Sequence, residues 1–232
     1  VLTGMFEGEL AKRVSTLGIT AAVDKSRFAE MYEHTVLRLD TPTPYQQRVL
    51  DECKDCQQLH IKGAAGTGKT FVGMLWILSR LQNDSHARVL YVAQNRALAL
   101  FFVRWMCIRV WSEAKDCDSQ ESLHILLQRL DVLYPVLLAG NKRQEALLLH
   151  RRFRCIAGTL HAVPAASGKC QYQLVVEDEA HHMYSSSNDN SKAWQDQVQS
   201  FITEGVTARL LLSDVSQSTT SNNFPTTDMK EV

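Results

Sequence analysis

The segment 63–70 restricts the fold of this chain more than any other stretch of its sequence. It reads Gly63, Ala64, Ala65, Gly66, Thr67, Gly68, Lys69 and Thr70, the phosphate-binding-loop pattern of glycine, four residues, glycine, lysine and then threonine or serine. Residues 59–61 before it alternate as in a short strand, and residues 71–78 after it are apolar, as in a buried helix. A loop of this kind between a strand and a helix predicts an α/β fold. The alternative, a chance glycine-rich turn, is disfavoured because both flanks fit.

The residue types in this loop are those that phosphate binding requires. Its glycines let successive backbone N–H groups point into one concavity, and the following helix adds the positive end of its dipole. The β-phosphate of a nucleotide fits such a nest. Lys69 would then reach the β- and γ-phosphates, and the Thr70 hydroxyl would take one Mg²⁺ coordination position.

A second candidate segment, residues 172–181, ends an apolar run in paired carboxylates. We expect Asp178 to hold the Mg²⁺ sphere, directly or through water, and Glu179 to polarise the attacking water. The alternative is an acidic strand end that faces solvent. Two carboxylates beside an apolar run are costly to bury without a cation, and the phosphate-binding loop supplies a reason for one. Together the two segments predict a nucleotide-hydrolysis site.

The composition is that of a globular protein with balanced charge. With 232 residues, 45% of them hydrophobic, the chain can bury the core of one large α/β domain, with or without an appendage. It has 25 basic and 25 acidic residues, so any contact with nucleic acid has to come from a local patch. The one notable basic cluster is Lys142 and Arg143 together with residues 151–154. A solvated helix face is the default interpretation of this cluster, and a nucleic-acid contact is the alternative.

The cysteines and the apolar segments bear on the compartment. Most of the six cysteines lie in apolar segments, and the one C-x-x-C pair, Cys53 and Cys56, has no second pair at zinc spacing. Unpaired thiols in a nucleotide-binding core indicate a reducing compartment, so we expect an intracellular location in cytoplasm or nucleus. The longest apolar stretch, 97–111, is interrupted by Arg104 and Arg109, and no membrane-spanning segment is expected.

The pattern of the sequence divides the chain into three parts. Residues 1–40 predict a small helical lead-in, residues 41–220 a nucleotide-binding lobe, and residues 221–232 a polar tail. Within the lobe we expect strands at 88–93, 172–178 and 208–213, helices at 97–111 and 194–202, and a helical, leucine-rich stretch at 112–150. Gln46 follows a helix start at Thr43, where it either hydrogen-bonds an adenine edge or is a solvated glutamine.

These segments together resemble the first RecA-like lobe of superfamily-one helicases. In chain order the matching segments are Thr43–Gln46 (Q motif), Gly63–Thr70 (motif I), Val92–Ala97 (motif Ia), Gly158–His161 (motif Ib), Asp178–His181 (motif II) and Ser213–Gln217 (motif III). Leu160 departs from the aromatic residue of motif Ib, and Ser213 departs from the glycine of motif III. Motif III favours superfamily one, because superfamily two usually has Ser-Ala-Thr there.

The resemblance implies a RecA-like P-loop fold, with a mostly parallel sheet flanked by helices on both faces. It also implies ATP and Mg²⁺ as cofactors and an enzyme that is a hydrolase acting on acid anhydrides. Gln46 would be the adenine contact, Gln217 the γ-phosphate sensor, and motif Ia a contact with single-stranded DNA or RNA. In the intact protein, hydrolysis would drive the opening and closing of two lobes on a nucleic-acid strand.

We expect the chain to be a piece of a longer protein that contains a second RecA-like lobe. That lobe would supply arginines, which are worth about 10³ to 10⁵ in rate at related phosphoryl-transfer sites. The fragment alone is therefore expected to bind nucleotide and to hydrolyse it poorly. Two alternatives remain open, a nucleotide-dependent signalling switch in a large multidomain protein, and a scaffold lobe that keeps the pattern without the activity.

Overall fold

The computed structural model describes residues 41–113, 119–136, 147–165, 168–184, 191–203, 206, 208–214 and 229–232. The chain divides into two compact units, Val1–Arg38 and Leu39–Val232, and all described residues belong to the second unit. The predicted helical segment 1–40 and the predicted boundary at residue 220 lie outside the described residues. Within the described ranges, no helix combines the length and the apolar character needed to cross a lipid bilayer.

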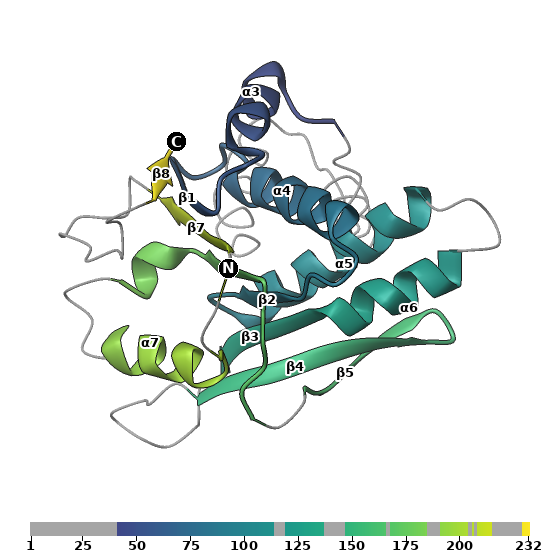
Figure 1. Cartoon of the computed structure of the whole chain (residues 1–232). Helices are drawn as coiled ribbons and strands as arrows, with labels where there is room; N and C mark the ends of the chain where they lie inside the picture. Colours follow the sequence, from purple (N-terminus) through teal and green to yellow (C-terminus); the bar gives the residue numbers. More distant parts are fainter. Residues whose placement is uncertain are drawn as a thin grey trace, which may run out of the picture. The chain divides into compact units, whose positions relative to one another are not determined.

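An eight-stranded sheet organises the described unit, with the strand order β5-β4-β3-β2-β6-β7-β1-β8 (Figure 1). The strands are β1 (Gln58–Gly63), β2 (Val89–Val92), β3 (Leu130–Val136), β4 (Leu147–Ile156), β5 (Thr159–Pro164), β6 (Leu174–Asp178), β7 (Ala208–Asp214) and β8 (Lys230–Glu231). Neighbours from β3 to β8 in this order pair in parallel, whereas β3–β4 and β4–β5 are antiparallel. The predicted mostly parallel sheet is confirmed.

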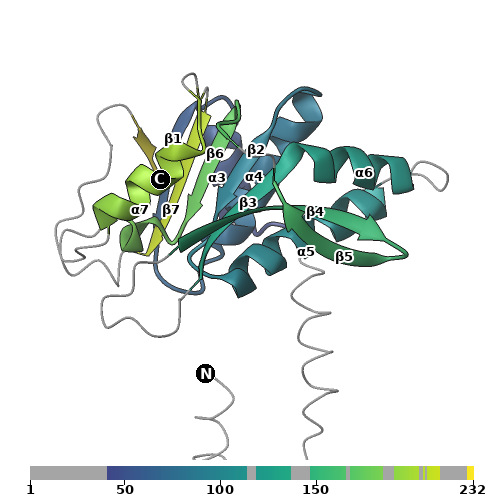
Figure 2. The same cartoon turned by 90° about the horizontal axis from the view of Figure 1, so that it is seen from below.

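Helices cover both faces of this sheet (Figures 1 and 2). They are α3 (Pro44–Cys53), α4 (Lys69–Asn83), α5 (Arg96–Glu113), α6 (Ser119–Arg129), the 3-10 helix η1 (Ala180–His182) and α7 (Ser191–Ser200). Successive residues of a strand point to opposite faces. Leu210 and Leu212 of β7 lie against Gly73 of α4, whereas Leu211 belongs to the core cluster that contains Val198 of α7. The prediction of helices on both faces is therefore confirmed.

The carboxyl ends of four parallel strands meet at one edge of the sheet. Gly63 at the end of β1 pairs with Asp214 at the end of β7, and Asp178 at the end of β6 pairs with Leu212. Val92 at the end of β2 pairs with a residue of β6 next to Asp178. Segments that are far apart in the sequence are thus brought together, and ligands of open parallel sheets bind at this kind of edge.

The stretch 112–150, which the sequence predicts to be helical, is helical only in part. Helix α6 ends at Arg129, and the chain continues directly as β3 and returns as β4. Leucines suit either structure, but Val132 and Tyr134 favour a strand, and Pro135 is not tolerated inside a helix. Pairing with β2 on one side and β4 on the other gives these residues their backbone partners. The helical prediction is wrong for residues 130–136 and 147–150, which are in strands.

Strands β4 and β5 form a hairpin that extends past the amino end of β3. Asp131 pairs with Arg152, and β4 then runs on to Ile156, beyond the end of its partner strand. The two turn residues, Ala157 and Gly158, both have positive φ, as a two-residue hairpin turn of the primed type requires. The predicted motif Ib, which begins at Gly158, therefore lies at the edge of the sheet opposite the phosphate-binding loop. The assignment of this segment to motif Ib stays a prediction.

The end of the chain contributes a short strand that the predicted polar tail did not include. Lys230 and Glu231 pair in parallel with β1. Their side chains fix this strand in place, because Glu231 forms an ion pair with Lys62, and the Lys230 ammonium donates to the Glu52 carbonyl over 2.7 Å. These are contacts between polar residues far apart in the sequence, which hydrophobic patterning does not detect.

A buried histidine on β1 makes the stability of this fold depend on pH. His60 is fully buried, with its Nε2 atom 2.7 Å from the Ser213 hydroxyl, and burial lowers its pKa to about 4. An unfolded histidine has a pKa of about 6.5. Between these values the unfolded state binds more protons, so stability falls as the pH falls, by at most about 1.4 kcal/mol per pH unit.

We predict that lowering the pH from 7 to 5 removes about 2 kcal/mol of stability through His60. Urea denaturation at several pH values measures this, with His60→Gln as the comparison. Groups such as Asp178 titrate in both proteins, so their contributions to the pH dependence of stability cancel when the two slopes are compared. The variant should show a flatter dependence between pH 6.5 and pH 4. Parallel slopes would mean that His60 does not set the dependence.

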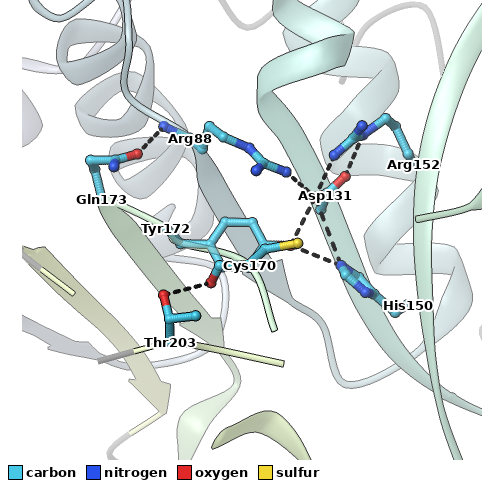
Figure 3. Close-up of polar contacts among 8 residues, drawn as sticks. All are labelled: Arg88, Asp131, His150, Arg152, Cys170, Tyr172, Gln173 and Thr203. Carbon is cyan, nitrogen blue, oxygen red and sulfur yellow. Dashed lines mark hydrogen bonds and ion pairs between the residues drawn. The ribbon is translucent and has the colours of Figure 1, made fainter. Parts of the chain in front are cut away.

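A buried polar network joins the hairpin to the parallel strands (Figure 3). Asp131 of β3 is 1% exposed and accepts two hydrogen bonds from Arg152 of β4, at 2.7 and 2.8 Å. It also accepts from Arg88 at 3.1 Å and from the Tyr172 hydroxyl at 2.8 Å. Burial raises the pKa of Asp131, but interactions with His150, Arg152 and Tyr172 outweigh it and hold the pKa well below its usual range.

Candidate nucleotide site

The phosphate-binding loop joins β1 to α4, as the sequence predicts. Gly66 and Gly68 have φ angles of 79° and 87°, in the left-handed region that favours glycine. Gly68 is the N-cap of α4, so the helix begins at Lys69. A Cβ atom on Gly68 would lie 2.4 Å from the Gln46 side-chain nitrogen, so that flexible side chain would have to move, and the positive φ angle is what favours glycine at this position.

Hydrogen bonds within the loop hold its curvature. The Ala64 carbonyl accepts from the Lys69 ammonium at 3.0 Å and from the Thr67 hydroxyl at 2.9 Å. The Lys69 side chain thus folds back over the loop, and its charge lies beside the loop's backbone. An anion held by the loop's N–H groups would be next to this ammonium group.

The structure brings Gln46 to the loop. Its side-chain nitrogen donates to the Thr67 carbonyl at 3.1 Å, and its side-chain oxygen accepts from the Thr43 N–H at 2.9 Å. The Thr43 hydroxyl accepts from the Gln46 N–H in return, so the two residues form a capping box at the start of α3. Gln46 therefore connects α3 to the loop, and its predicted contact with adenine stays a prediction.

The two halves of the predicted site meet at Thr70 and Asp178. The Thr70 hydroxyl lies 3.0 Å from Asp178 Oδ2 and 3.4 Å from Oδ1. Asp178 is 2% exposed, and its Oδ1 atom also accepts the Glu179 N–H at 2.9 Å. Burial raises the pKa of Asp178 to about 6, although hydrogen bonds from Tyr91 and Thr70 lower it. A hydroxyl and a carboxylate are hard oxygen donors, the set that suits Mg²⁺.

Sequence analysis missed Tyr91, a third residue that contacts Asp178. The Tyr91 hydroxyl donates to Asp178 Oδ2 at 2.5 Å. Tyr91 pairs with Val176, two residues before Asp178, so the strand alternation puts Tyr91 and Asp178 on the same face. The signal in the sequence was a single hydroxyl in an apolar strand, which cannot be connected to Asp178 before the order of the strands is known.

Glu179 and the following 3-10 turn have an unusual backbone. Glu179 has a φ angle of 59°, a left-handed conformation that is rare for residues with a side chain and that often marks functional sites. His181 Nδ1 accepts the Asp214 N–H at 3.2 Å, so its proton is on Nε2, which faces Glu179 Oε2 at 3.5 Å. His181 thus links the predicted motifs II and III.

A second group of side chains at this edge has the atoms to hold a metal ion. Ligand atoms of Glu179, His181 and His182 lie within 4.8 Å of one another. A histidine that accepts a hydrogen bond at Nδ1 and carries its proton on Nε2 is not prepared to ligate a cation. Thr70 and Asp178 are therefore the better-prepared oxygen donors for a metal ion next to a bound phosphate.

Only some of the residues predicted to contact nucleic acid or the γ-phosphate lie within the described part of the chain. Asn95, at the carboxyl end of β2, caps α5 by accepting the Leu98 N–H at 2.9 Å, and Asn95 and Arg96 are both exposed at the predicted motif Ia. Gln217, Lys142 and Arg143 lie outside the described residues. Of the basic run 151–154, Arg152 is engaged by Asp131 rather than facing solvent as a free cation.

Comparisons with known proteins show the family to which this chain belongs. A solved structure similar to this chain is a mutant of the ATPase domain of the large terminase of a Thermus phage, with 12% sequence identity and a TM-score of 0.35. The match covers 76% of this chain and 66% of that chain, so this chain spans less than two thirds of it. No curated protein sequence gives a significant match. The family model described as DEAD/DEAH box helicase matches residues 43–213, and the chain belongs to this helicase domain family.

Proposed function

We propose that this chain is the Mg-ATP-binding lobe of a helicase-like ATPase. In the intact protein, hydrolysis of ATP would drive movement along single-stranded DNA or RNA. Domains of the DEAD/DEAH box helicase family generally bind ATP and nucleic acid and use Mg²⁺. The observation that carries the proposal is the 3.0 Å contact between Thr70 of the phosphate-binding loop and Asp178 of motif II.

Different residues at this edge of the sheet would bind the phosphates, the cation, the attacking water and the adenine. The N–H groups of the segment Gly63–Thr70 bind the phosphates, and Lys69 neutralises their charge. Thr70 and Asp178 would hold the cation, and when bound it would neutralise charge on the phosphates. Glu179 lies next to Asp178 and orients the attacking water, and Gln217 senses the γ-phosphate. Gln46 contacts the adenine.

We propose that the chain alone hydrolyses ATP poorly, because the arginines of a second lobe are needed to complete the site. An intracellular location, in cytoplasm or nucleus, is proposed on the same basis as before, the unpaired thiols of the core. The balanced charge of 25 basic and 25 acidic residues supports a second candidate function, a nucleotide-dependent switch or scaffold that unwinds nothing.

Titration of a fluorescent ATP analogue into this chain in the presence of Mg²⁺ tests the proposed binding. We expect saturable binding that unlabelled ATP displaces. Failure to bind would remove the nucleotide site and leave the scaffold alternative. For an intact protein that hydrolyses ATP, stimulation of the rate by single-stranded DNA or RNA separates the helicase-like function from the switch. A rate that neither nucleic acid changes would favour the switch.

A further inference from the structure

We propose that Tyr91 is a positioning residue that orients the Asp178 carboxylate for the metal ion of the bound nucleotide. The proposal rests on the proposed function, since it concerns the same Mg-ATP site. Tyr91 lies on β2, outside the segments that carry the family resemblance, and nothing in the sequence assigns it a role. Its contact with Asp178 appears only when β2 and β6 are placed side by side.

The Tyr91 ring is held in place by burial and by stacking on a neighbouring ring. The residue is fully buried, and its ring stacks on that of Phe102 of α5, with a centroid distance of 3.7 Å and an interplanar angle of 5°. Its hydroxyl therefore has little freedom and lies 2.5 Å from Asp178 Oδ2. A tyrosine hydroxyl carries one proton at neutral pH, and Asp178 Oδ2 is the acceptor placed to receive this hydrogen bond.

The two carboxylate oxygens of Asp178 accept hydrogen bonds from different donors. Oδ2 accepts from Tyr91 and, at 3.0 Å, from Thr70, whereas Oδ1 accepts the Glu179 N–H. The Thr70 hydroxyl can ligate a cation through an oxygen lone pair and still donate its proton to Asp178. Three donors therefore hold the carboxylate, and of these the Tyr91 hydroxyl is not expected to ligate the cation itself. Such outer partners of a metal ligand typically contribute about 10- to 100-fold in metal affinity or activity.

The alternative is that Tyr91 only supports the fold, and the chain contains a tyrosine that serves as the comparison. Tyr172 is 1% exposed, and its hydroxyl donates to the buried carboxylate of Asp131 at 2.8 Å. Asp131 lies at the amino end of β3, the edge of the sheet opposite the phosphate-binding loop. Tyr91→Phe and Tyr172→Phe therefore each remove a hydroxyl that donates to a buried aspartate, one inside the candidate site and one outside it. Tyr172→Phe also removes a contact of 2.9 Å with His150 Nε2, so it is the more demanding control for folding.

The test is Mn²⁺ binding to the chain with ADP, followed by electron paramagnetic resonance of the free ion, with the protein in excess over ADP. We expect Tyr91→Phe to weaken Mn²⁺ binding about 10- to 100-fold. Its affinity for ADP without metal should stay within about twofold of the wild type, since the phosphate-binding loop is untouched. Tyr172→Phe should bind Mn²⁺ like the wild type. In an Asp178→Asn background, Tyr91→Phe should cause no further loss, because the two residues act together.

Each remaining outcome is decisive. A Tyr91→Phe variant that binds Mn²⁺ like the wild type overturns the proposal. So does a Tyr91→Phe variant that fails to fold, judged by circular dichroism, while Tyr172→Phe folds, because the hydroxyl would then serve the fold. A loss that persists unchanged in the Asp178→Asn background also overturns it. A wild-type chain that binds neither ADP nor Mn²⁺ contradicts the proposed function itself, which is a separate result.

Discussion

Replacing Asp131 with asparagine is expected to lower the free energy of unfolding by about 3 to 5 kcal/mol, the cost of breaking a buried ion pair from one side. The amide is neutral and cannot accept the paired hydrogen bonds of Arg152 while it also accepts from Arg88 and Tyr172. Both guanidinium groups would remain at the edge of the core without their counter-ion. The lost hydrogen bonds lie at the junction between the hairpin and the parallel strands, so we expect the packing there to weaken (Figure 3).

Urea denaturation followed by circular dichroism measures this loss, and Asp51→Asn is the matched control. Asp51 is an exposed residue of α3 that accepts one hydrogen bond from Gln47 at 2.8 Å. Its substitution should change stability by no more than about 0.5 kcal/mol. If Asp131→Asn also costs less than about 1 kcal/mol, the network does not hold the hairpin in place.

Replacing Lys69 with alanine is expected to weaken ATP binding by about 100-fold or more, which corresponds to about 2.7 kcal/mol. Hydrogen bonds to charged groups contribute about 1.5 to 3 kcal/mol each, and the ammonium group is expected to bond to two phosphates. In the structure this group already lies at the loop, 3.0 Å from the Ala64 carbonyl. Isothermal titration calorimetry with ATP and Mg²⁺ measures the change.

Lys62→Ala is the control for this prediction, since it removes the same charge from the residue just before the loop. Lys62 is paired with Glu231 and is not part of the phosphate-binding pattern. It should bind ATP like the wild type. Equal affinities for wild type and Lys69→Ala would exclude the loop as the binding site, whereas an equal loss in both variants would indicate a general effect of charge.

The sequence was sufficient to predict the parallel strands β1, β2, β6 and β7 and the meeting of the two segments that end β6 and follow β1. The segment Gly63–Thr70 and the acidic pair at 178–179 each follow an apolar strand. Parallel strands end at the same edge, so their positions in space follow from the fold class alone. This is why Thr70 and Asp178, more than a hundred residues apart, were predicted to share a site. In the structure the Thr70 hydroxyl lies 3.0 Å from Asp178 Oδ2.

The features that were not predicted depend on pairing between strands. The leucine-rich stretch after Arg129 has no local signal strong enough to separate strand from helix, and its partners β2 and β4 decide the outcome. The contact between Tyr91 and Asp178 likewise forms only because β2 and β6 are neighbours in the sheet. Lys230 and Glu231 are polar residues that join the sheet through one strand and two side-chain contacts.

One distinction within the helicases stays a prediction. The family match identifies a DEAD/DEAH box helicase domain. The preference for superfamily one rests on motif III, of which Ser213 and Asp214 are described, whereas Gln217 lies outside the described residues. Asp214 is in contact with His181 of motif II through its N–H group, so the two motifs are adjacent whichever superfamily applies.

The gain in ATP affinity that Mg²⁺ provides is the most direct test of a shared nucleotide and metal site at this edge of the sheet. Calorimetric titrations of ATP with and without Mg²⁺ give this gain for the wild type and for Asp178→Asn. We predict that Mg²⁺ tightens ATP binding to the wild type by about tenfold or more, and that most of this gain is lost in Asp178→Asn while metal-free binding is kept. An undiminished gain in Asp178→Asn would contradict the account, because the metal would then be held elsewhere.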